Sequence, residues 1–321
     1  CPLPLAFRLP REDSLMINAH PVLPEFDYIK PQTFSEASQF LLEHAGEARP
    51  MMGGTDVLVR LRDGVWKDKY LVDVKGLEGM NDISFDPASG LTIGAAVSMN
   101  RVSDFPAVKE HYPVLAEAVD SVASYQLRSR ATIVGNICNA SPAGDTNGVC
   151  ILLGGVLDVY GVDGMRQEAL DAFFQGPGKT VLKPGDVAVS INLPPPPKGS
   201  VGKYIKLGRN KASDLSIVGV TVIGYPDAGT ASGYRIKLAL ASVAPIPLVV
   251  GRVEEILSAN PITGDTLAEA AQAAMQASNP IDDVRATARY RKMMVRNLSA
   301  SALTAVWEEL KAACLNHQSR L

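Results

Sequence analysis

The sequence predicts an α+β protein in two parts, and three observations support this fold class. In the first part, a glycine loop lies between a predicted strand and a predicted helix, in a β-α-β arrangement. A second strand, over residues 187–193, runs into four consecutive prolines at 194–197, which cannot continue a sheet and form a stiff connector. Beyond the prolines, strands are followed by helices, the order of an α+β domain.

The first part begins with a helix predicted over residues 33–44. Thr33 can cap its N-terminus, and Gly46 follows its end. Residues 56–62 form a second predicted helix after the glycine loop, with Asp56 placed as its cap. Strands are expected over residues 70–74 and 91–96, which are flanked by turn residues.

Apolar residues recur every three or four positions from Pro113 to Tyr125, which predicts an amphipathic helix there. A second glycine turn, residues 132–136, follows directly. Ser141 can then cap a further helix that has Pro142 as its first residue and extends through residues 149–153.

The last part contains two predicted strands and then three predicted helices. The strands lie around residues 218–225 and 234–243. The helices lie near residues 253–259, 267–277 and 284–313.

Composition excludes several classes of function. The 321 residues carry a net charge of -3, so no broad basic surface invites nucleic acid. The longest apolar run, residues 238–250, is broken by Pro245 and Pro247 and is shorter than the roughly 20 residues of a membrane span. Residues 1–15 lack the apolar core of a signal peptide, and we treat residues 1–19 as an N-terminal extension.

The four cysteines are dispersed and show no Cys-x-x-Cys spacing. This usage is typical of a reduced, cytoplasmic protein with packed thiols, and we expect no metal site in the chain.

The first glycine loop, Met52-Gly53-Gly54-Thr55-Asp56, lets backbone N–H groups lie against an anion, since glycine has no Cβ. The alternative is a plain tight turn before a helix.

The second loop is harder to explain as a turn, because Arg128 and Arg130 precede it and Ser141 and Asp145 follow it. Cations, hydroxyls and amides of this kind can bind phosphate or ribose. Two such loops suit a ligand with a pyrophosphate. Neither matches the Gly-x-Gly-x-x-Gly pattern or a Walker loop, which disfavours a Rossmann NAD site and an NTPase.

Taken together, these motifs resemble the medium, FAD-binding subunit of the molybdenum hydroxylases, the family of carbon monoxide dehydrogenase, xanthine dehydrogenase and 4-hydroxybenzoyl-CoA reductase. The resemblance covers about residues 20–313. Its carriers are Phe26-Asp27-Tyr28 with Pro31, Gly53-Gly54-Thr55-Asp56, Thr132-x-x-Gly135-Asn136, Asn139-Ala140-Ser141-Pro142, Lys206-x-x-Arg209 with Asp214, Ala286-Thr287 and Tyr290-Arg291.

The resemblance implies a two-subdomain FAD-binding fold of the vanillyl-alcohol-oxidase type, over residues 20–193 with subdomains of about 20–75 and 76–193. A proline linker at 194–199 and a C-terminal α+β domain over 200–321, with an antiparallel sheet and helices, would follow. The implied cofactor-binding residues are Met52, Gly53, Gly54, Thr55, Asp56, Thr132, Ile133, Val134, Gly135, Asn136, Ser141, Asp145, Val187, Lys206, Asp214 and Leu215.

The implied function is flavin electron transfer, with no acid–base catalytic residue in this chain. Partners would be a small subunit with iron–sulfur clusters and a large subunit with the molybdenum cofactor, and the external acceptor would be NAD, a quinone or another oxidant. The dispersed cysteines disfavour the 4-hydroxybenzoyl-CoA reductase branch, which carries an extra cysteine-rich loop. Two alternatives stay open: a stand-alone flavoprotein oxidoreductase of the same fold, and a noncatalytic nucleotide-binding protein.

Overall fold

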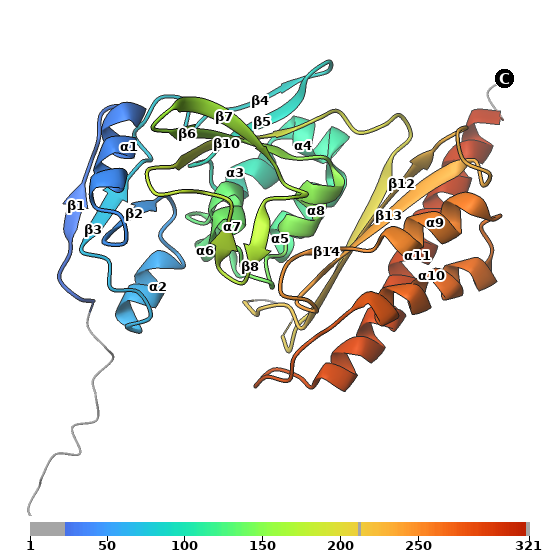
Figure 1. Cartoon of the computed structure of the whole chain (residues 1–321). Coiled ribbons are helices and arrows are strands. Elements are labelled where there is room, and N and C mark those ends of the chain that lie inside the picture. The colour runs from blue at the N-terminus through green and yellow to red at the C-terminus, as the bar shows by residue number, and fades with distance from the viewer. Residues whose placement is uncertain (1–22, 211–212, 319–321) are drawn as a thin grey trace, which may run out of the picture.

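The structure is a computed structural model that describes residues 23–210 and 213–318. The proposed extension at residues 1–19 lies outside the described residues. Figure 1 shows a small N-terminal sheet, a larger middle sheet with helices below it, and a C-terminal sheet backed by three helices. The mixed α+β class predicted from the sequence is confirmed.

The N-terminal sheet is parallel, with strand order β1-β3-β2. Its elements are β1 (Asp27–Ile29), α1 (Phe34–Glu43), β2 (Ala48–Met51), α2 (Val57–Arg62) and β3 (Tyr70–Asp73). Thr33 caps α1 by accepting from the backbone N–H of Glu36, as predicted. The β2-α2-β3 unit is the predicted β-α-β arrangement, with the first glycine loop where β2 leads into α2.

The middle sheet is antiparallel, with order β4-β5-β10-β6-β7. Its strands are β4 (Ile83–Asp86), β5 (Gly90–Gly94), β6 (Val156–Gly161), β7 (Gly164–Ala169) and β10 (Val187–Leu193); β8 (Phe174–Gly176) and β9 (Lys179–Thr180) form a separate pair. Its helices are α3 (Met99–Asp104), α4 (Pro106–His111), α5 (Pro113–Ser121), α6 (Tyr125–Arg128), α7 (Ile133–Asn139) and α8 (Asn147–Leu152). All of these helices except α6 share one apolar core with strands β4, β5, β6 and β10.

The C-terminal sheet has order β11-β12-β13-β14, all antiparallel. It consists of β11 (Val201–Leu207), β12 (Val218–Pro226), β13 (Tyr234–Ala241) and β14 (Leu248–Val249), followed by α9 (Gly251–Ala259), α10 (Gly264–Ala277) and α11 (Ala288–Gln318). Helix α11 packs on β11 and β12 and α9 on β13, while α5 and α8 of the preceding domain contact the same sheet. Because both faces are covered, β12 is buried along seven consecutive residues.

Four local predictions are wrong, and each has a physical reason. The helix predicted to Tyr125 ends at Ser121, because Ala123 adopts a left-handed φ of 43° and Ser124 caps the new helix α6. Residues 132–136 are the start of helix α7 rather than a turn. Thr132 caps α7 by accepting from the N–H of Gly135 at 2.9 Å.

The other two errors concern caps. The Asp56 side chain makes no capping hydrogen bond to α2, so its carboxylate does not pair with the N–H groups at the start of that helix. Helix α8 begins at Asn147 instead of Pro142. The C-terminal domain holds this segment out of helical geometry, since the N–H of Ser242 donates to the Pro142 carbonyl at 2.7 Å.

Candidate functional site

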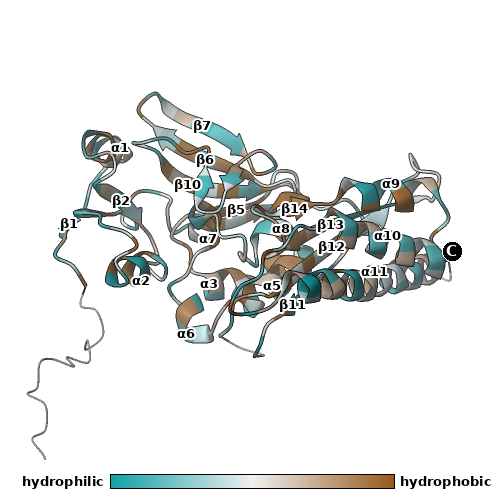
Figure 2. Cartoon of the chain, turned by 60° about the horizontal axis from the view of Figure 1, so that its bottom comes forward, coloured by the Kyte–Doolittle hydropathy of each residue, from teal (hydrophilic) through white to brown (hydrophobic). Residues whose placement is uncertain are grey.

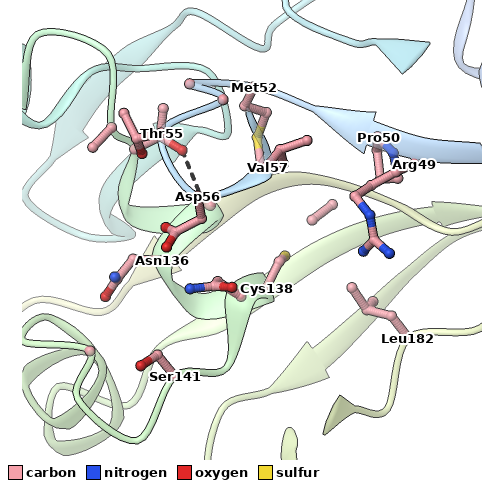
Figure 3. A pocket seen from close by; sticks show the side chains of 18 of the residues that line it. Arg49, Pro50, Met52, Thr55, Asp56, Val57, Asn136, Cys138, Ser141 and Leu182 are labelled. Carbon is pink, nitrogen blue, oxygen red and sulfur yellow. Dashed lines mark hydrogen bonds between the residues drawn. The ribbon is translucent and has the colours of Figure 1, made fainter. Parts of the chain in front are cut away.

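A cavity of about 700 Å³ lies between the N-terminal sheet, helix α7 and the edge of the C-terminal domain. Four stretches of chain form most of its wall: residues 45–57, 131–145, 182–188 and 213–215. In Figure 3, Arg49 and Leu182 lie toward one end, and Asn136 and Ser141 toward the other. A cavity of this size holds a cofactor-sized ligand.

The first glycine loop forms one wall through its backbone. A Cβ on Gly53 would lie 2.1 Å from the carbonyl oxygen of Arg130, so only glycine lets these two segments touch. Gly54 has a left-handed φ of 74°. Among the described residues, no acceptor pairs with the N–H groups of Gly53, Gly54 and Thr55. The loop therefore presents a row of free donors to the cavity.

Helix α7 forms the opposite wall. The backbone N–H groups of its first residues, Ile133 and Val134, have no partner within the helix, while their side chains are buried in the core. Gly135 and Asn136 line the cavity, and the Asn136 side chain accepts from the Thr146 hydroxyl at 3.0 Å. On the next turn, Cys138 and Asn139 also line the cavity, and Asn139 Oδ1 has no hydrogen-bond partner among the described groups.

Asp56 faces the cavity between these two walls (Figure 3). Although its side chain is accessible from the cavity, the surrounding walls desolvate the carboxyl and raise its pKa. The nearby Arg60 and Asn139 oppose that rise. The Asp56 carboxyl therefore gains a proton more readily than that of an ordinary aspartate.

One end of the cavity has an aromatic and cationic lining. The guanidinium of Arg49 lies 3.6 Å from the centroid of the Trp66 ring, and its Nε is 2.8 Å from Asp68. Arg60 approaches the same ring at 4.8 Å. A stacked pair of this kind gives a flat, positively charged surface. No sequence pattern indicated Arg49 and Trp66, because only the folding of the loop after α2 brings Trp66 back to β2.

At the other end, a buried network joins the cavity wall to strand β11. Asp145 accepts from the Tyr204 hydroxyl at 2.6 Å and from the Lys206 ammonium at 2.8 Å. Lys206 also donates to the Ser121 carbonyl at 2.9 Å. Burial raises the pKa of Asp145, and Lys206 and Tyr204 oppose the rise. Each Asp145 oxygen is thus engaged by the C-terminal domain.

Residues 213–215 reach the cavity from the same domain. The N–H of Ser213 donates to the carbonyl of Ala123 at 3.0 Å. The Asp214 carboxylate folds back on its own loop, accepting from the backbone N–H of Arg209 at 2.5 Å and from that of Leu215 at 3.0 Å. Leu215 is exposed at the cavity rim.

The structure brings together most of the residues singled out from the sequence, and three lie elsewhere. Ile133 and Val134 point into the core, and Lys206 lies behind Asp145 rather than in the cavity wall. The cavity-lining members are Met52, Gly53, Gly54, Thr55, Asp56, Thr132, Gly135, Asn136, Ser141, Asp145, Val187, Asp214 and Leu215.

Two further findings bear on the chemistry. Within residues 23–210 and 213–318, no cluster of three or more His, Cys, Asp and Glu side chains could hold a metal ion. No helix in the same ranges combines the length and apolarity needed to cross a membrane.

Comparison with known proteins shows which protein family has this architecture. Residues 24–196 match the family described as the FAD binding domain in molybdopterin dehydrogenase, and residues 203–306 match the CO dehydrogenase flavoprotein C-terminal domain. The carbon monoxide dehydrogenase medium chain of Hydrogenophaga pseudoflava is 30% identical over 284 residues, which cover 88% of this chain and 98% of that protein. The xanthine dehydrogenase FAD-binding subunit of Escherichia coli is 27% identical, over 86% and 94% of the two chains.

A solved structure supports the same conclusion. The carbon monoxide dehydrogenase of Hydrogenophaga pseudoflava that lacks the Mo-pyranopterin moiety superposes with a TM-score of 0.85 at 29% identity, and the match covers 90% of this chain and 99% of the other. The chain therefore belongs to the family of FAD-binding medium subunits of the molybdenum hydroxylases, and it is an oxidoreductase subunit whose own cofactor is FAD.

Proposed function

We propose that this chain is the electron-transfer subunit of a multi-subunit molybdenum-dependent dehydrogenase or hydroxylase. In this proposal it passes electrons between iron–sulfur clusters in a small partner subunit and an external acceptor such as NAD or a quinone. A large partner subunit would carry the molybdenum cofactor and oxidise the organic substrate. The unpaired N–H groups that face a cofactor-sized cavity carry the proposal.

The residues present fit FAD on two grounds. The cavity has a cofactor-sized volume of about 700 Å³, and Gly53 in its wall packs so closely against the Arg130 carbonyl that no Cβ fits there. The residues Gly53, Gly54 and Thr55 line the cavity together with the start of α7, and their N–H groups have no acceptor among the described residues, which suits the oxygens of a pyrophosphate.

When bound, FAD supplies one-electron and two-electron transfer, and the protein supplies placement and electrostatics. We assign the pyrophosphate contacts to residues 53–55 and 132–136, and further contacts to Met52, Asp56, Ser141, Val187 and Leu215. Asp145, with Lys206 and Tyr204 behind it, would fix the wall between the two domains, and Asp214 would hold the 213–215 loop in place.

Two further features belong to the proposal. We infer domain limits of 20–193 and 200–321, with the proline linker between them, in keeping with the two family matches. We also propose a cytoplasmic location, which suits the free thiols of Cys138, Cys150 and Cys314.

The first test is to purify the chain, release its cofactor by heat and identify the cofactor by mass. One FAD per chain is expected. The FAD-loaded chain is then mixed anaerobically with a reduced iron–sulfur subunit from the same source, while the flavin absorbance is followed. Bleaching of the flavin band supports electron transfer between subunits.

Two outcomes contradict the proposal. Turnover of an organic substrate by the isolated chain would indicate a stand-alone flavoprotein oxidoreductase. A chain that contains no flavin and takes up none would remove the electron-transfer role altogether.

A further inference from the structure

The stacked pair of Arg49 and Trp66 gives one end of the cavity a flat, cationic wall. The Arg49 guanidinium lies 3.6 Å from the centroid of the Trp66 ring, and its Nε donates to Asp68 at 2.8 Å. Among the described residues, neither Nη atom of Arg49 has a hydrogen-bond partner. In Figure 3 the guanidinium points toward Leu182. A planar cation held in this way can stack on a heteroaromatic ring and donate to its nitrogen atoms.

The surroundings of Arg49 are apolar. Ala48 and Pro50, its neighbours in strand β2, line the cavity as well, and so does Pro184, two residues after Leu182. Pockets that bind ring systems combine such an apolar lining with a few placed polar groups. This end of the cavity therefore suits a neutral heteroaromatic ring that can accept hydrogen bonds.

FAD has two ring systems, adenine and isoalloxazine, one on each side of its pyrophosphate. The far end of the cavity is lined by Leu127 and Leu215, which are both exposed, so that end opens to the surface where the two domains meet. The isoalloxazine exchanges electrons with a group outside the chain, which favours the open end for it. The Arg49 end belongs to the N-terminal sheet, which in Figures 1 and 2 lies on the opposite side of the molecule from the C-terminal helices.

We propose that Arg49, supported by Trp66, is a specificity-determining residue that binds the adenine ring of FAD. This inference rests on the proposed function, because it takes the pyrophosphate to lie against residues 53–55. FMN contains the same flavin ring but no adenine, and ADP contains the adenine and pyrophosphate but no flavin. Arg49 therefore contributes to the affinity for FAD and ADP and contributes nothing to the affinity for FMN.

The test makes the same substitution at two arginines that approach the same ring. Arg49→Lys keeps the positive charge and can still pair with Asp68, but an ammonium group has no flat face that stacks on a ring. Arg60→Lys is the matched control, because Arg60 lies 4.8 Å from the Trp66 ring but does not line the cavity. The full-length chain, with its FAD released, is titrated with FAD and FMN by flavin fluorescence and with ADP by competition against FAD.

We expect Arg49→Lys to bind FAD and ADP roughly tenfold more weakly than wild type and to bind FMN within about twofold of wild type. Arg60→Lys should change none of the three affinities by more than about twofold. Trp66→Leu removes the ring behind the guanidinium and should give the same pattern as Arg49→Lys. It decides the question if Arg49→Lys fails to fold, and melting temperatures check the folding of every variant.

The contrast between ADP and FMN separates this role from a structural one. If Arg49→Lys weakens FAD and FMN but not ADP, the flavin ring lies at the Arg49 end and the inference is wrong. Equal loss of all three ligands, or no change in any of them, also overturns it, and each of these results leaves the proposed function standing. A wild-type chain that neither holds nor takes up FAD overturns both.

Discussion

Around the cavity, several polar groups have no partner, whereas the buried guanidinium of Arg291, at the base of the C-terminal sheet, donates hydrogen bonds through two of its three nitrogens. The N–H groups of Gly53, Gly54 and Thr55 and the Oδ1 atom of Asn139 have no partner among the described residues. Arg291, by contrast, is only 1% exposed and donates to the carbonyls of Ile217 and Ser242 at 2.7 and 2.9 Å.

The difference indicates which region awaits a ligand and which one supports it. Arg291 also binds Asp283 at 2.7 Å, and only its Nε lacks a partner. The two carbonyls that it holds lie in segments that contact the cavity wall, because Ser242 donates to Pro142 and Ser216 donates to Ala143. Arg291 therefore connects helix α11 to the cavity without lining it.

Of the substitutions considered for these two regions, Arg291→Met should have the largest effect, and it should act on the stability of the protein. The change leaves two carbonyls without their donor and leaves Arg285 as the only arginine that still pairs with Asp283. Loss of one member of a buried ion pair costs about 3–5 kcal/mol. We expect the free energy of unfolding to fall by that amount in a urea titration. Arg289→Met is the control, since Arg289 lies on the same helix but is exposed. A loss below about 1 kcal/mol would mean that the network is not needed for stability.

The same network predicts a response to acid. Burial acts to raise the pKa of Asp283, but hydrogen bonds from Arg285 and Arg291 outweigh it and hold the pKa well below its usual range. A carboxyl whose pKa is lowered on folding stabilises the protein above its unfolded value of about 3.9 and loses that contribution as the pH falls through the folded value. Arg291→Met should therefore weaken the acid dependence of stability as well.

On the cavity side, Gly53→Ala should cause the second largest effect. Its Cβ would lie 2.1 Å from the Arg130 oxygen and 3.2 Å from the Ala131 Cα, both backbone atoms that cannot rotate away. Forcing the two walls apart costs about 1–3 kcal/mol, equivalent to a tenfold to hundredfold loss of FAD affinity. Quenching of flavin fluorescence on binding gives the dissociation constant.

The matched control for Gly53→Ala is Gly76→Ala, because nothing lies within 4 Å of a Cβ at Gly76. If both variants bind FAD like wild type, the contact between the two walls does not shape the site. If both lose FAD, the effect is one of general stability.

Sequence reasoning identified the elements that carry a strong local signal. The strand of residues 187–193 and the two long strands and three helices after the prolines are confirmed, with shifts at their ends. It missed helices α3, α4 and α6, which are too short to show a period, and strand β7, whose residues alternate between exposed and half-buried with few apolar side chains.

For the cavity, the sequence indicated the glycine loops but misjudged how side chains within them are used. Asp56 was predicted to cap a helix and instead faces the cavity, while Asp145 lines the cavity, where Tyr204 and Lys206 hold its carboxylate. The surroundings of both carboxyls were missed for the same reason. The partner of each carboxyl depends on a second segment, about 60 residues further along the chain for Asp145, and no local pattern reports it.

The smallest predicted effect concerns the pH dependence of FAD binding through Asp56. Desolvation by the cavity raises the pKa of Asp56, so its proton is lost at a pH above the ordinary value of about 3.9. In the FAD-free chain, the contribution of this group to stability is present below that value and lost as the pH rises through the raised pKa. Ionised Asp56 also repels the pyrophosphate, so FAD affinity should fall by up to about tenfold over the same rise in pH.

Asp56→Asn should remove that slope and leave FAD affinity nearly constant, because the amide carries no charge at any pH. Fluorescence titrations of FAD from about pH 4.5 to about pH 7 would measure this pH dependence of the affinity. Asp171→Asn is the control, because Asp171 is exposed. A variant that binds FAD weakly at every pH would instead show that the carboxylate accepts a hydrogen bond from the cofactor. In that case the first glycine loop would bind FAD through the Asp56 side chain as well as through the N–H groups of residues 53–55. The difference between the cavity, whose groups await a ligand, and Arg291, whose partners lie within the chain, would then apply to side chains as well as to the backbone.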